Sequence, residues 1–363
     1  MKVGELISKI DNFAPFFLQE SYDNSGLQFG DLEEEVKKVV LSLELTEASV
    51  NFAIKNNANV VLSHHPILFF SVKNIVKQDM PTLYKAIKNG INVVAAHTNF
   101  DIAENGLNDF VGNMLEIEKE GPIQYSHEKI YKFAVYVPKQ HADEVRKAVF
   151  EAGAGKIGKY GDTSFNVSGI GTFKPMEGTH PFIGAVGETS TVDEIKIETV
   201  VPERFLNRVI FAMKQSHPYE EPAYDIFELK SVSSNSGIGM VGKLGKKFSL
   251  PEFAQFVKSR LNARYVRFIG DKNVGIERVA FCSGSGFSLI NSVRSKNVDL
   301  FISGDITYHN AIRAKEIGVN ILDVEHFDTE KFFVPAMKKS LLTVGANVEL
   351  IEFNDEKSPF DLL

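Results

Sequence analysis

The sequence is poor in cysteine, in long apolar runs and in positive charge. Its single cysteine, Cys282, excludes an intramolecular disulfide framework and any CxxC motif, and it fits a reducing compartment. No apolar run approaches the ~18 residues that a membrane helix needs, and the N-terminal residues lack the apolar core of a signal peptide. The formal net charge of −7 disfavours binding of nucleic acid through bulk positive charge. We therefore expect a cytoplasmic protein with no membrane partner and no indication of nucleic-acid binding.

The chain is long enough to form more than one domain. Its 363 residues correspond to two or three domains at roughly 150 residues each. Apolar residues make up 44% of the chain, so a substantial core can be buried without disulfide bonds or a structural metal.

The first and last thirds share one pattern, in which short apolar runs alternate with helical segments. The expected strands of the first third are 36–45, 59–63 and 91–96, and its expected helices are 47–55 and 81–89. The expected strands of the last third are 279–282, 299–303, 319–324 and 348–353, and its expected helices are 251–261, 309–317 and one toward Leu342. Such alternation is typical of a parallel or mixed sheet covered on both faces. It predicts two similar α/β units with mixed sheets.

The middle of the chain has a different order of elements. Its expected strands are 131–137, 163–173, 194–201 and 223–229, and its expected helices are 142–152 and 203–217. This β-α-β-β-α-β order predicts an inserted α+β domain of the ferredoxin-like type. Polar flanks at 118–128 and 231–239 favour domain boundaries there. We expect residues 1–126 and 233–363 to form the two halves of one α/β core, and residues 127–232 to form the insertion.

Histidines and carboxylates follow four of the strands expected in the outer thirds. They are His64 and His65 after 59–63, His97 and Asp101 after 91–96, Asp305 and His309 after 299–303, and His326 and Glu330 after 319–324. Five of the nine histidines thus lie just past strand ends, the edge at which α/β sheets bind ligands. Imidazole and carboxylate ligands suit Zn, Fe, Mn, Co and Ni, whereas a lone cysteine disfavours a thiolate zinc site. We expect a metal-binding core with more than one ion, since a carboxylate can bridge two metals.

Seven short motifs resemble the family of GTP cyclohydrolase 1 type 2 homologs, the Ngg-one-interacting-factor-three-like proteins. The motifs are residues 23–28 (DNSGLQ), 43–46 (LELT), 63–69 (SHHPILF), 96–101 (AHTNFD), 303–305 (SGD), 308–311 (YHNA) and 325–330 (EHFDTE). They cover both outer thirds of the chain. One departure is Glu44, at a position where the family commonly has aspartate.

The resemblance implies a dinuclear centre with two divalent metal ions per subunit. By position, its ligands would be His64, His65, Asp101, His326 and Glu330, with Glu330 as the bridge. His97 and His309 would lie close by as acid/base groups. The resemblance also implies a homohexamer assembled from trimers, in which the insertion resembles the trimer-forming PII and copper-tolerance-A fold. The segment 217–222 (HPYEEP) carries that likeness, and it fits a proline-bounded loop equally well.

A centre of this kind favours hydrolysis, because two metals can activate a water and hold the oxygens of the attacked group. The family name implies metal-activated water acting on a nucleotide such as GTP. Because imidazole titrates near working pH, His97 or His309 could carry protons as a catalytic residue, and either could instead support the ligands. Two alternatives stay open: a metal-dependent phosphoesterase, and a metal-responsive oligomeric regulator or scaffold that is not an enzyme. The sequence has no P-loop. The turn at 283–286 fits either phosphate binding or a tight strand-to-helix connection.

Overall fold

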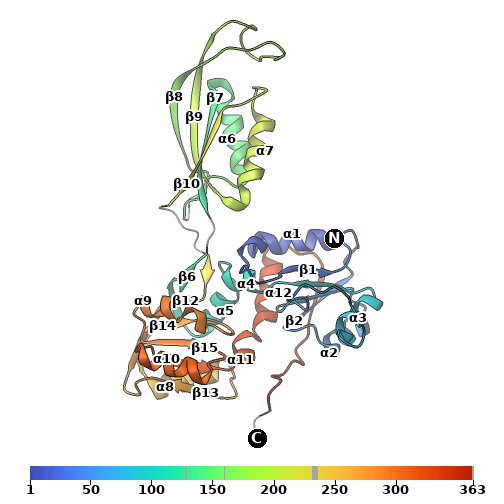
Figure 1. The fold of residues 1–363 in the computed structure, drawn as a ribbon, viewed down its shortest axis with the longest axis vertical. Helices are drawn as coiled ribbons and strands as arrows, with labels where there is room; N and C mark the ends of the chain where they lie inside the picture. Colours follow the sequence, from blue (N-terminus) through green and yellow to red (C-terminus); the bar gives the residue numbers. More distant parts are fainter. Residues whose placement is uncertain (127–128, 159, 231–235, 362–363) are drawn as a thin grey trace. The chain divides into compact units, whose positions relative to one another are not determined.

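The computed structural model describes residues 1–126, 129–158, 160–230 and 236–361, which form two compact units (Figure 1). Unit 1 consists of Met1–Ser126 with Asn235–Leu363, and unit 2 consists of His127–Ser234. The boundaries predicted between 126 and 127 and between 232 and 233 fall on residues outside the described part of the chain. Within the described residues, no helix is both long and apolar enough to cross a membrane.

The first sheet of unit 1 combines strands from both ends of the chain. Its order is β1 (Gly26–Phe29), β4 (Asn92–Ala95), β3 (Val60–Ser63), β2 (Lys38–Ser42) and β17 (Glu349–Glu352). The last four strands are parallel, and β1 pairs antiparallel with β4. All residues of β3 and β4 are buried, which explains their continuous apolar sequence.

The second sheet of unit 1 is also mixed. Its order is β13 (Val266–Ile269), β16 (Ile321–Val324), β15 (Leu300–Ser303), β14 (Gly275–Phe281), β12 (Met240–Ser249) and β5 (Ile117–Gly121). The strands β14, β15 and β16 are parallel, and the others pair antiparallel. Here β5 comes from the first third of the chain, just as β17 of the first sheet comes from the last third. Each of the two sheets therefore takes one strand from the other end of the chain, and this exchange ties the two halves into one unit.

One continuous apolar core joins the inner faces of the two sheets. Alternate strand residues enter it from both sides, including Leu41 and Leu62 of the first sheet and Phe281 and Ile302 of the second. Helices α1 (Val3–Phe13), α5 (Leu107–Met114), α8 (Leu250–Arg260) and α12 (Phe333–Thr343) contribute buried residues to the same core. Figure 1 shows α12 between the two sheets.

Other helices cover the outer faces of the sheets. Helix α2 (Glu47–Lys55) and helix α3 (Pro81–Lys88) pack on the first sheet through residues such as Val50 and Ala86, which meet Val61. Helix α9 (Ile290–Ser295) and helix α10 (Tyr308–Glu316) cover the second sheet. The carboxyl ends of the parallel strands of both sheets remain uncovered by these helices and supply the polar cluster described below.

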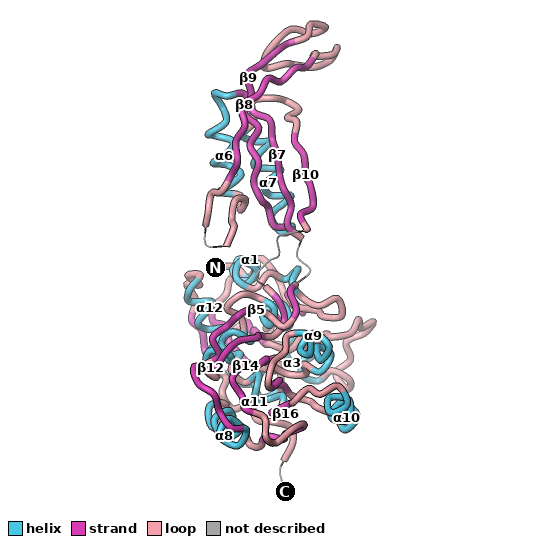
Figure 2. The backbone as a smooth tube through the Cα atoms, turned by 90° about the vertical axis from the view of Figure 1, so that its left-hand side faces the viewer, coloured by secondary structure: helices cyan, strands magenta, loops and turns pink. Residues whose placement is uncertain are grey.

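Unit 2 contains one antiparallel sheet with two helices. Its elements in chain order are β7 (Ile130–Pro138), α6 (Ala142–Glu151), β8 (Ser164–Phe173), β9 (Ser190–Pro202), α7 (Leu206–Ser216) and β10 (Tyr224–Leu229). The order of strands in the sheet is β10-β7-β9-β8, and they lie side by side in Figure 2. Both helices pack on one face around a buried core that includes Val145, Val209 and Phe133. The six elements occur in the order predicted from the sequence.

Candidate metal centre

A buried polar cluster lies at the carboxyl ends of the parallel strands of unit 1. His64 and His65 directly follow β3, His97 follows β4 after one residue, and His326 follows β16 after one residue. Two short helices carry the carboxylates: α4 (Thr98–Ile102) carries Asp101, and α11 (His326–Glu330) ends with Glu330. The carboxyl ends of parallel strands lie at the same edge of a sheet. Side chains that follow these strands therefore meet there, although they are far apart in the sequence.

Glu330 lies at the centre of the cluster, and its two oxygen atoms face different histidines. Its Oε2 atom is 2.7 Å from Nε2 of His326 and 3.1 Å from Nε2 of His65. Its Oε1 atom is 3.9 Å from Nε2 of His64, which is in turn 3.7 Å from Oδ2 of Asp101. His64, Asp101 and Glu330 are all buried, with exposed fractions of 0%, 8% and 3%.

Each of the four histidines has its Nδ1 atom bound by a neighbouring oxygen. The pairs are His64 with the carbonyl of Ala96 (2.9 Å), His65 with Glu44 (2.6 Å), His97 with Asp23 (2.8 Å) and His326 with Asp305 (2.7 Å). A carbonyl oxygen can only accept, so Nδ1 of His64 carries the hydrogen and its Nε2 presents a lone pair. This arrangement of imidazole with a fixed Nδ1–H and a free Nε2 is the usual way in which proteins orient histidine ligands of metals.

Three buried polar atoms of the cluster make no hydrogen bond. They are Nε2 of His64, Nε2 of His326 and Oε2 of Glu330. Nε2 of His326 and Oε2 of Glu330 face each other at 2.7 Å, whereas Nε2 of His64 is 3.7 Å from Asp101 and 3.9 Å from Glu330. A buried polar atom without a hydrogen bond costs about 1–3 kcal/mol and calls for a partner. Lone pairs on imidazole and carboxylate atoms are metal ligands, so the residues present fit a metal ion on chemical grounds.

Two groups of three side chains bring their ligand atoms within 4.8 Å of one another. One group is His64, His65 and His97, and the other is His65, His326 and Glu330. Either group can hold a metal ion, and the two share His65. Asp101 adds a carboxylate at the side of His64.

Burial and charge shift the pKa values of these groups in opposite directions. Burial lowers the pKa of His64 well below its usual value, so its imidazole is neutral. Burial opposes the charge on His65 and His326 as well. The carboxylate of Glu330 nevertheless raises the pKa of His65 well above the usual value, and Asp305 with Glu330 raises the pKa of His326 to about 10.

The two carboxylates of the cluster also differ. Burial opposes the charge on Glu330, but the neighbouring cations His65 and His326 hold its pKa well below the usual value. Burial and the nearby charge of Glu330 raise the pKa of Asp101 to about 7. In the absence of a metal, Glu330 is therefore the anion around which the two protonated imidazoles gather.

The turn after β14 is shaped around Glu330. Gly284 has a φ of +58°, and a Cβ atom at this position would lie 2.1 Å from Oε1 of Glu330. The amide of Gly284 donates to Oγ1 of Thr329 (2.9 Å), and that of Gly286 donates to Oγ of Ser303 (2.9 Å). Because these amides already have partners within the fold, the turn at 283–286 serves as a tight connection, and the structure offers no support for the phosphate-binding interpretation.

Asn108 and Ser283 join the two halves of the site. The amide of Ser283 donates to Oδ1 of Asn108 (2.8 Å), and Nδ2 of Asn108 donates to the carbonyl of Asp101 (3.0 Å). These bonds fix Asp101, from the first half of the chain, against the turn after β14. The sequence analysis assigned no role to Asn108, and no periodic or motif signal marks it.

His97 and His309 have different surroundings. His97 precedes α4, and its ring lies 5.1 Å from that of His64 and 5.2 Å from that of His65. His309 is exposed in the first turn of α10, where its ring contacts that of Tyr308 at 5.4 Å. The structure thus brings His97 into the cluster with the five predicted ligands, and it places His309 on the helix surface.

Three carboxylates that contact the histidines had no assigned role in the sequence analysis: Asp23, Glu44 and Asp305. Asp23 and Asp305 belong to motifs that carried the family resemblance, so that signal was present without a role attached. Glu44 belongs to the motif 43–46 of the same resemblance, where it is also a departure from the family pattern. Its contact with His65 shows that the longer side chain still reaches the histidine.

A cavity of about 590 Å³ adjoins the cluster and is lined by His65 and His326. Its wall includes the aromatic rings of Tyr265, Phe327 and Phe360. Six carboxylate residues and two cationic residues, Arg267 and Lys357, also line it. The cavity gives a small molecule a place beside the polar cluster.

The sequence and fold are similar to those of other bacterial proteins. The family described as "Duf34/NIF3 (NGG1p interacting factor 3)" matches residues 1–359. A Bacillus subtilis protein named "GTP cyclohydrolase 1 type 2 homolog" is 36% identical over 99% of this chain and 98% of its own length. A Halalkalibacterium halodurans protein of the same name is 38% identical over 93% of this chain and 91% of its own length. The crystal structure of a Bacillus cereus protein related to NIF3 superposes with a TM-score of 0.90, at 34% identity, over 100% of this chain and 99% of that one. The chain therefore belongs to the Duf34/NIF3 family.

Proposed function

We propose that the cluster around Glu330 is a dinuclear metal centre that supports hydrolysis. The observation that carries this proposal is the orientation of the histidines, whose Nδ1 atoms are fixed while their Nε2 atoms converge on one buried carboxylate. The proposed ligands are His64, His65, Asp101, His326 and Glu330. Metal-dependent hydrolases commonly hold two ions through such mixed imidazole and carboxylate ligands.

Glu330 is the proposed bridge between the two ions. Its Oε1 atom faces His64, and its Oε2 atom faces His65 and His326. Asp101 lies beside His64, with its Oδ2 atom 3.7 Å from Nε2 of that histidine. A carboxylate whose two oxygens face two separate sets of ligands supports two metal positions better than one.

When bound, the ions would activate a water and polarise the attacked group. The protein itself would position the ligands and handle protons. Asp23 holds the Nδ1–H of His97 at 2.8 Å, so Nε2 of His97 can accept and return a proton at the cluster. The adjoining cavity would hold the substrate against His65 and His326.

GTP is the substrate implied by the names of the relatives, and we propose it as the first compound to test. The alternative substrate is a phosphate ester, because two metal ions can hold both oxygens of such an ester.

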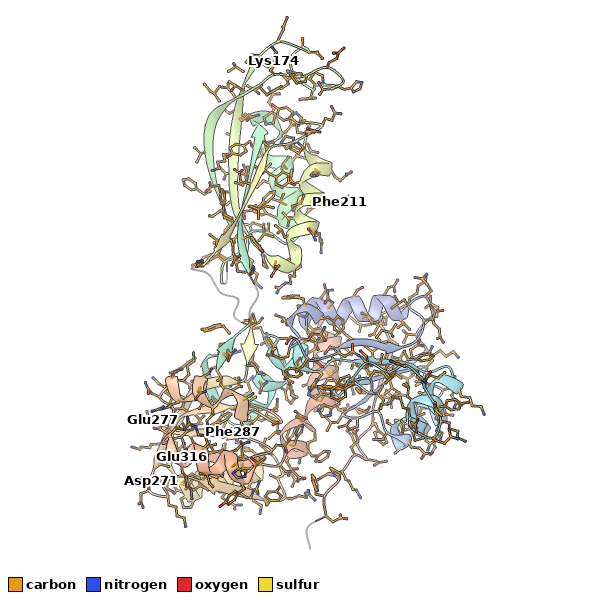
Figure 3. The ribbon with its side chains drawn as sticks, viewed as in Figure 1. Lys174, Phe211, Asp271, Glu277, Phe287 and Glu316 are labelled. Atoms are coloured by element: carbon orange, nitrogen blue, oxygen red, sulfur yellow. The ribbon has the colours of Figure 1, made fainter. Side chains whose placement is uncertain are left out.

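The experiment compares metal content and turnover in protein purified without a metal-affinity tag. Mass spectrometry of the metal should give two ions per chain, and the same sample is assayed with GTP and with phosphate esters. Glu330→Gln should lose both metal and turnover, whereas Glu277→Gln, at an exposed position of β14, should retain both (Figure 3). If the protein holds two ions per chain but turns over no nucleotide or ester, the hydrolase proposal is wrong. The metal-responsive, non-enzymatic role then remains.

For unit 2 we propose a ferredoxin-like domain, within residues 127–232, that forms trimers in a homohexamer. The strand order β10-β7-β9-β8 with both helices on one face supports the ferredoxin-like assignment. Light scattering of the full chain and of a chain lacking 127–232 tests the assembly. The full chain should be a hexamer, and the shortened chain should form an oligomer with fewer subunits. An unchanged number of subunits after the deletion would remove the trimer-forming role.

A further inference from the structure

Unit 2 contains a cavity that the proposed metal chemistry does not use. Its volume is about 650 Å³, and it lies between the end of β8, the segment that connects β8 to β9, and the segment that connects α7 to β10. Its wall combines aromatic rings with carboxylates. The wall includes the rings of Phe173, Phe182 and Tyr219 and the carboxylates of Glu194, Glu220 and Glu221.

The three rings form a connected group with different orientations. The ring of Tyr219 lies 5.5 Å from that of Phe173 at an angle of 61°, and 6.4 Å from that of Phe182 at 56°. Phe182 is 55% exposed, so a ligand in the cavity can reach its ring. Aromatic rings set at angles around a common space are the arrangement that recognises organic cations.

His217 holds Tyr219 in place. The amide of Tyr219 donates to Nδ1 of His217 at 3.0 Å, and Nε2 of His217 donates to the carbonyl of Tyr136 at 2.9 Å. Both ring nitrogens of His217 are thereby used, which fixes a neutral tautomer. The segment 217–222 is therefore more than a proline-bounded loop, because its hydrogen bonds set the position of a ring in the cavity wall.

The carboxylate of Glu194 is also fixed at the cavity. Its Oε1 atom accepts the hydroxyl of Tyr219 at 3.0 Å. A Cβ atom on Gly171 would lie 2.2 Å from its Oε2 atom, so the carboxylate lies over a position where the strand has no side chain. Glu220 accepts the amide of His180 at 3.1 Å.

Among the described residues that line the cavity, Lys174 is the one cationic side chain, so the described wall has an excess of negative charge. Within the described residues, Glu194, Glu220 and Glu221 form no salt bridge. Among the described residues, none of these three glutamates belongs to a group of side chains that could hold a metal ion. Aromatic rings with dispersed carboxylates thus favour a cation larger than a metal ion, and they disfavour an anion.

We propose that this cavity binds a small organic cation. The positive group of the ligand would contact the faces of the Phe182 and Tyr219 rings. The carboxylates of Glu194, Glu220 and Glu221 would neutralise its charge. All residues that line this cavity belong to unit 2.

The test is calorimetric titration of the full-length chain with choline, spermidine and agmatine. The neutral counterpart is 3,3-dimethyl-1-butanol, which has the shape of choline without its charge. We expect at least one of the cations to bind, and if choline binds, roughly tenfold more tightly than the neutral alcohol, since a cation gains from both rings and carboxylates. Failure of all three cations to bind, or equal affinity for choline and the alcohol, would overturn the proposal.

Variants locate the site. Gly171→Ala should weaken binding by displacing the carboxylate of Glu194, a flexible group whose movement leaves the strand intact. Phe182→Ala should weaken it by removing a ring. Lys174→Gln should strengthen it by removing a like charge. Phe211→Ala is the control, because Phe211 is 66% exposed on α7 and outside the cavity wall (Figure 3). Binding that persists unchanged in both Gly171→Ala and Phe182→Ala would contradict this location.

Discussion

His326 and Glu330 stand at the two ends of α11, and Nε2 of His326 lies 2.7 Å from Oε2 of Glu330 without forming a hydrogen bond. The i,i+4 spacing places both side chains on one face of the helix. Asp305 holds the other nitrogen of His326 at 2.7 Å. The two atoms are thus brought close by the backbone and by Asp305, as the proposed metal centre requires of two ligands of one ion.

Asp305→Asn should weaken metal binding by about 10–100-fold, because carboxylates that orient histidine ligands have effects of that size. Asp305 has a φ of +56°, a region that asparagine also tolerates, so the backbone should be undisturbed. Competition with a chelator measures the affinity. Asp271→Asn, at an exposed position in a loop of the same half, is the control (Figure 3). Equal affinity in both variants would mean that Asp305 does not orient a ligand.

Gly284→Ala should remove metal from the site while the protein stays folded. The new Cβ atom would lie 2.1 Å from Oε1 of Glu330 and displace the carboxylate. Gly318→Ala is a matched control, because its φ of +72° carries a similar backbone cost, of about 1 kcal/mol, with no atom within 4 Å. Melting temperatures of the two variants should fall by similar amounts, and metal content should fall only in Gly284→Ala. Full metal content in Gly284→Ala would show that Glu330 is not a ligand.

Metal binding at pH 7.5 should release about two protons, because His65 and His326 have raised pKa values and must lose a proton to act as ligands. His64 is already neutral and contributes none. Calorimetry in buffers of different ionisation enthalpy measures the number. Metal affinity should rise as the pH increases from 7.5 toward the raised pKa values of His65 and His326. A release of no protons would exclude His65 and His326 as ligands.

The metal-free protein should show the opposite dependence on pH. Raised pKa values in the folded state mean that the protonated histidines stabilise the fold. This stabilisation is complete below the unfolded pKa of about 6.5 and is lost as pH rises toward about 10, the folded pKa of His326. Urea denaturation of metal-free protein should show that the free energy of unfolding falls between pH 6 and pH 10. This fall should be smaller in His326→Gln. A stability that rises across this range would contradict the raised pKa.

His97→Ala should reduce turnover at least tenfold, because its Nε2 atom lies within the cluster and its Nδ1–H is fixed by Asp23. His309→Ala should leave metal content unchanged, because its side chain is exposed on α10. Turnover and metal content of both variants, measured together, separate a proton carrier from a ligand. A loss of activity in His309→Ala would restore the role predicted from the sequence.

Much of the fold was predictable because the strands that lead to the cluster are continuous apolar runs. Strands β3, β4 and β16 end within a residue of the predicted limits, so the histidines after them could be assigned to one edge. The pairing of β17 with β2 and of β5 with β12 was not predictable, since apolar pattern does not identify a partner far away in the sequence.

The partners of the histidines were harder to predict than the histidines themselves. Asp23 comes from a loop before β1, and Asp305 from a turn with positive φ, and neither position has periodicity that reveals its contact. His309 shows the converse limit. It follows a strand in the sequence, but helix α10 begins at Tyr308 and leaves the side chain exposed.

Anomalous diffraction from crystals of the tag-free protein, recorded at the absorption edge of the metal that mass spectrometry identifies, tests the central claim most directly. Two peaks on either side of the Glu330 carboxylate, one beside His64 and Asp101 and one beside His326, are the predicted result. A single peak, or peaks that do not contact Glu330, would contradict the dinuclear centre.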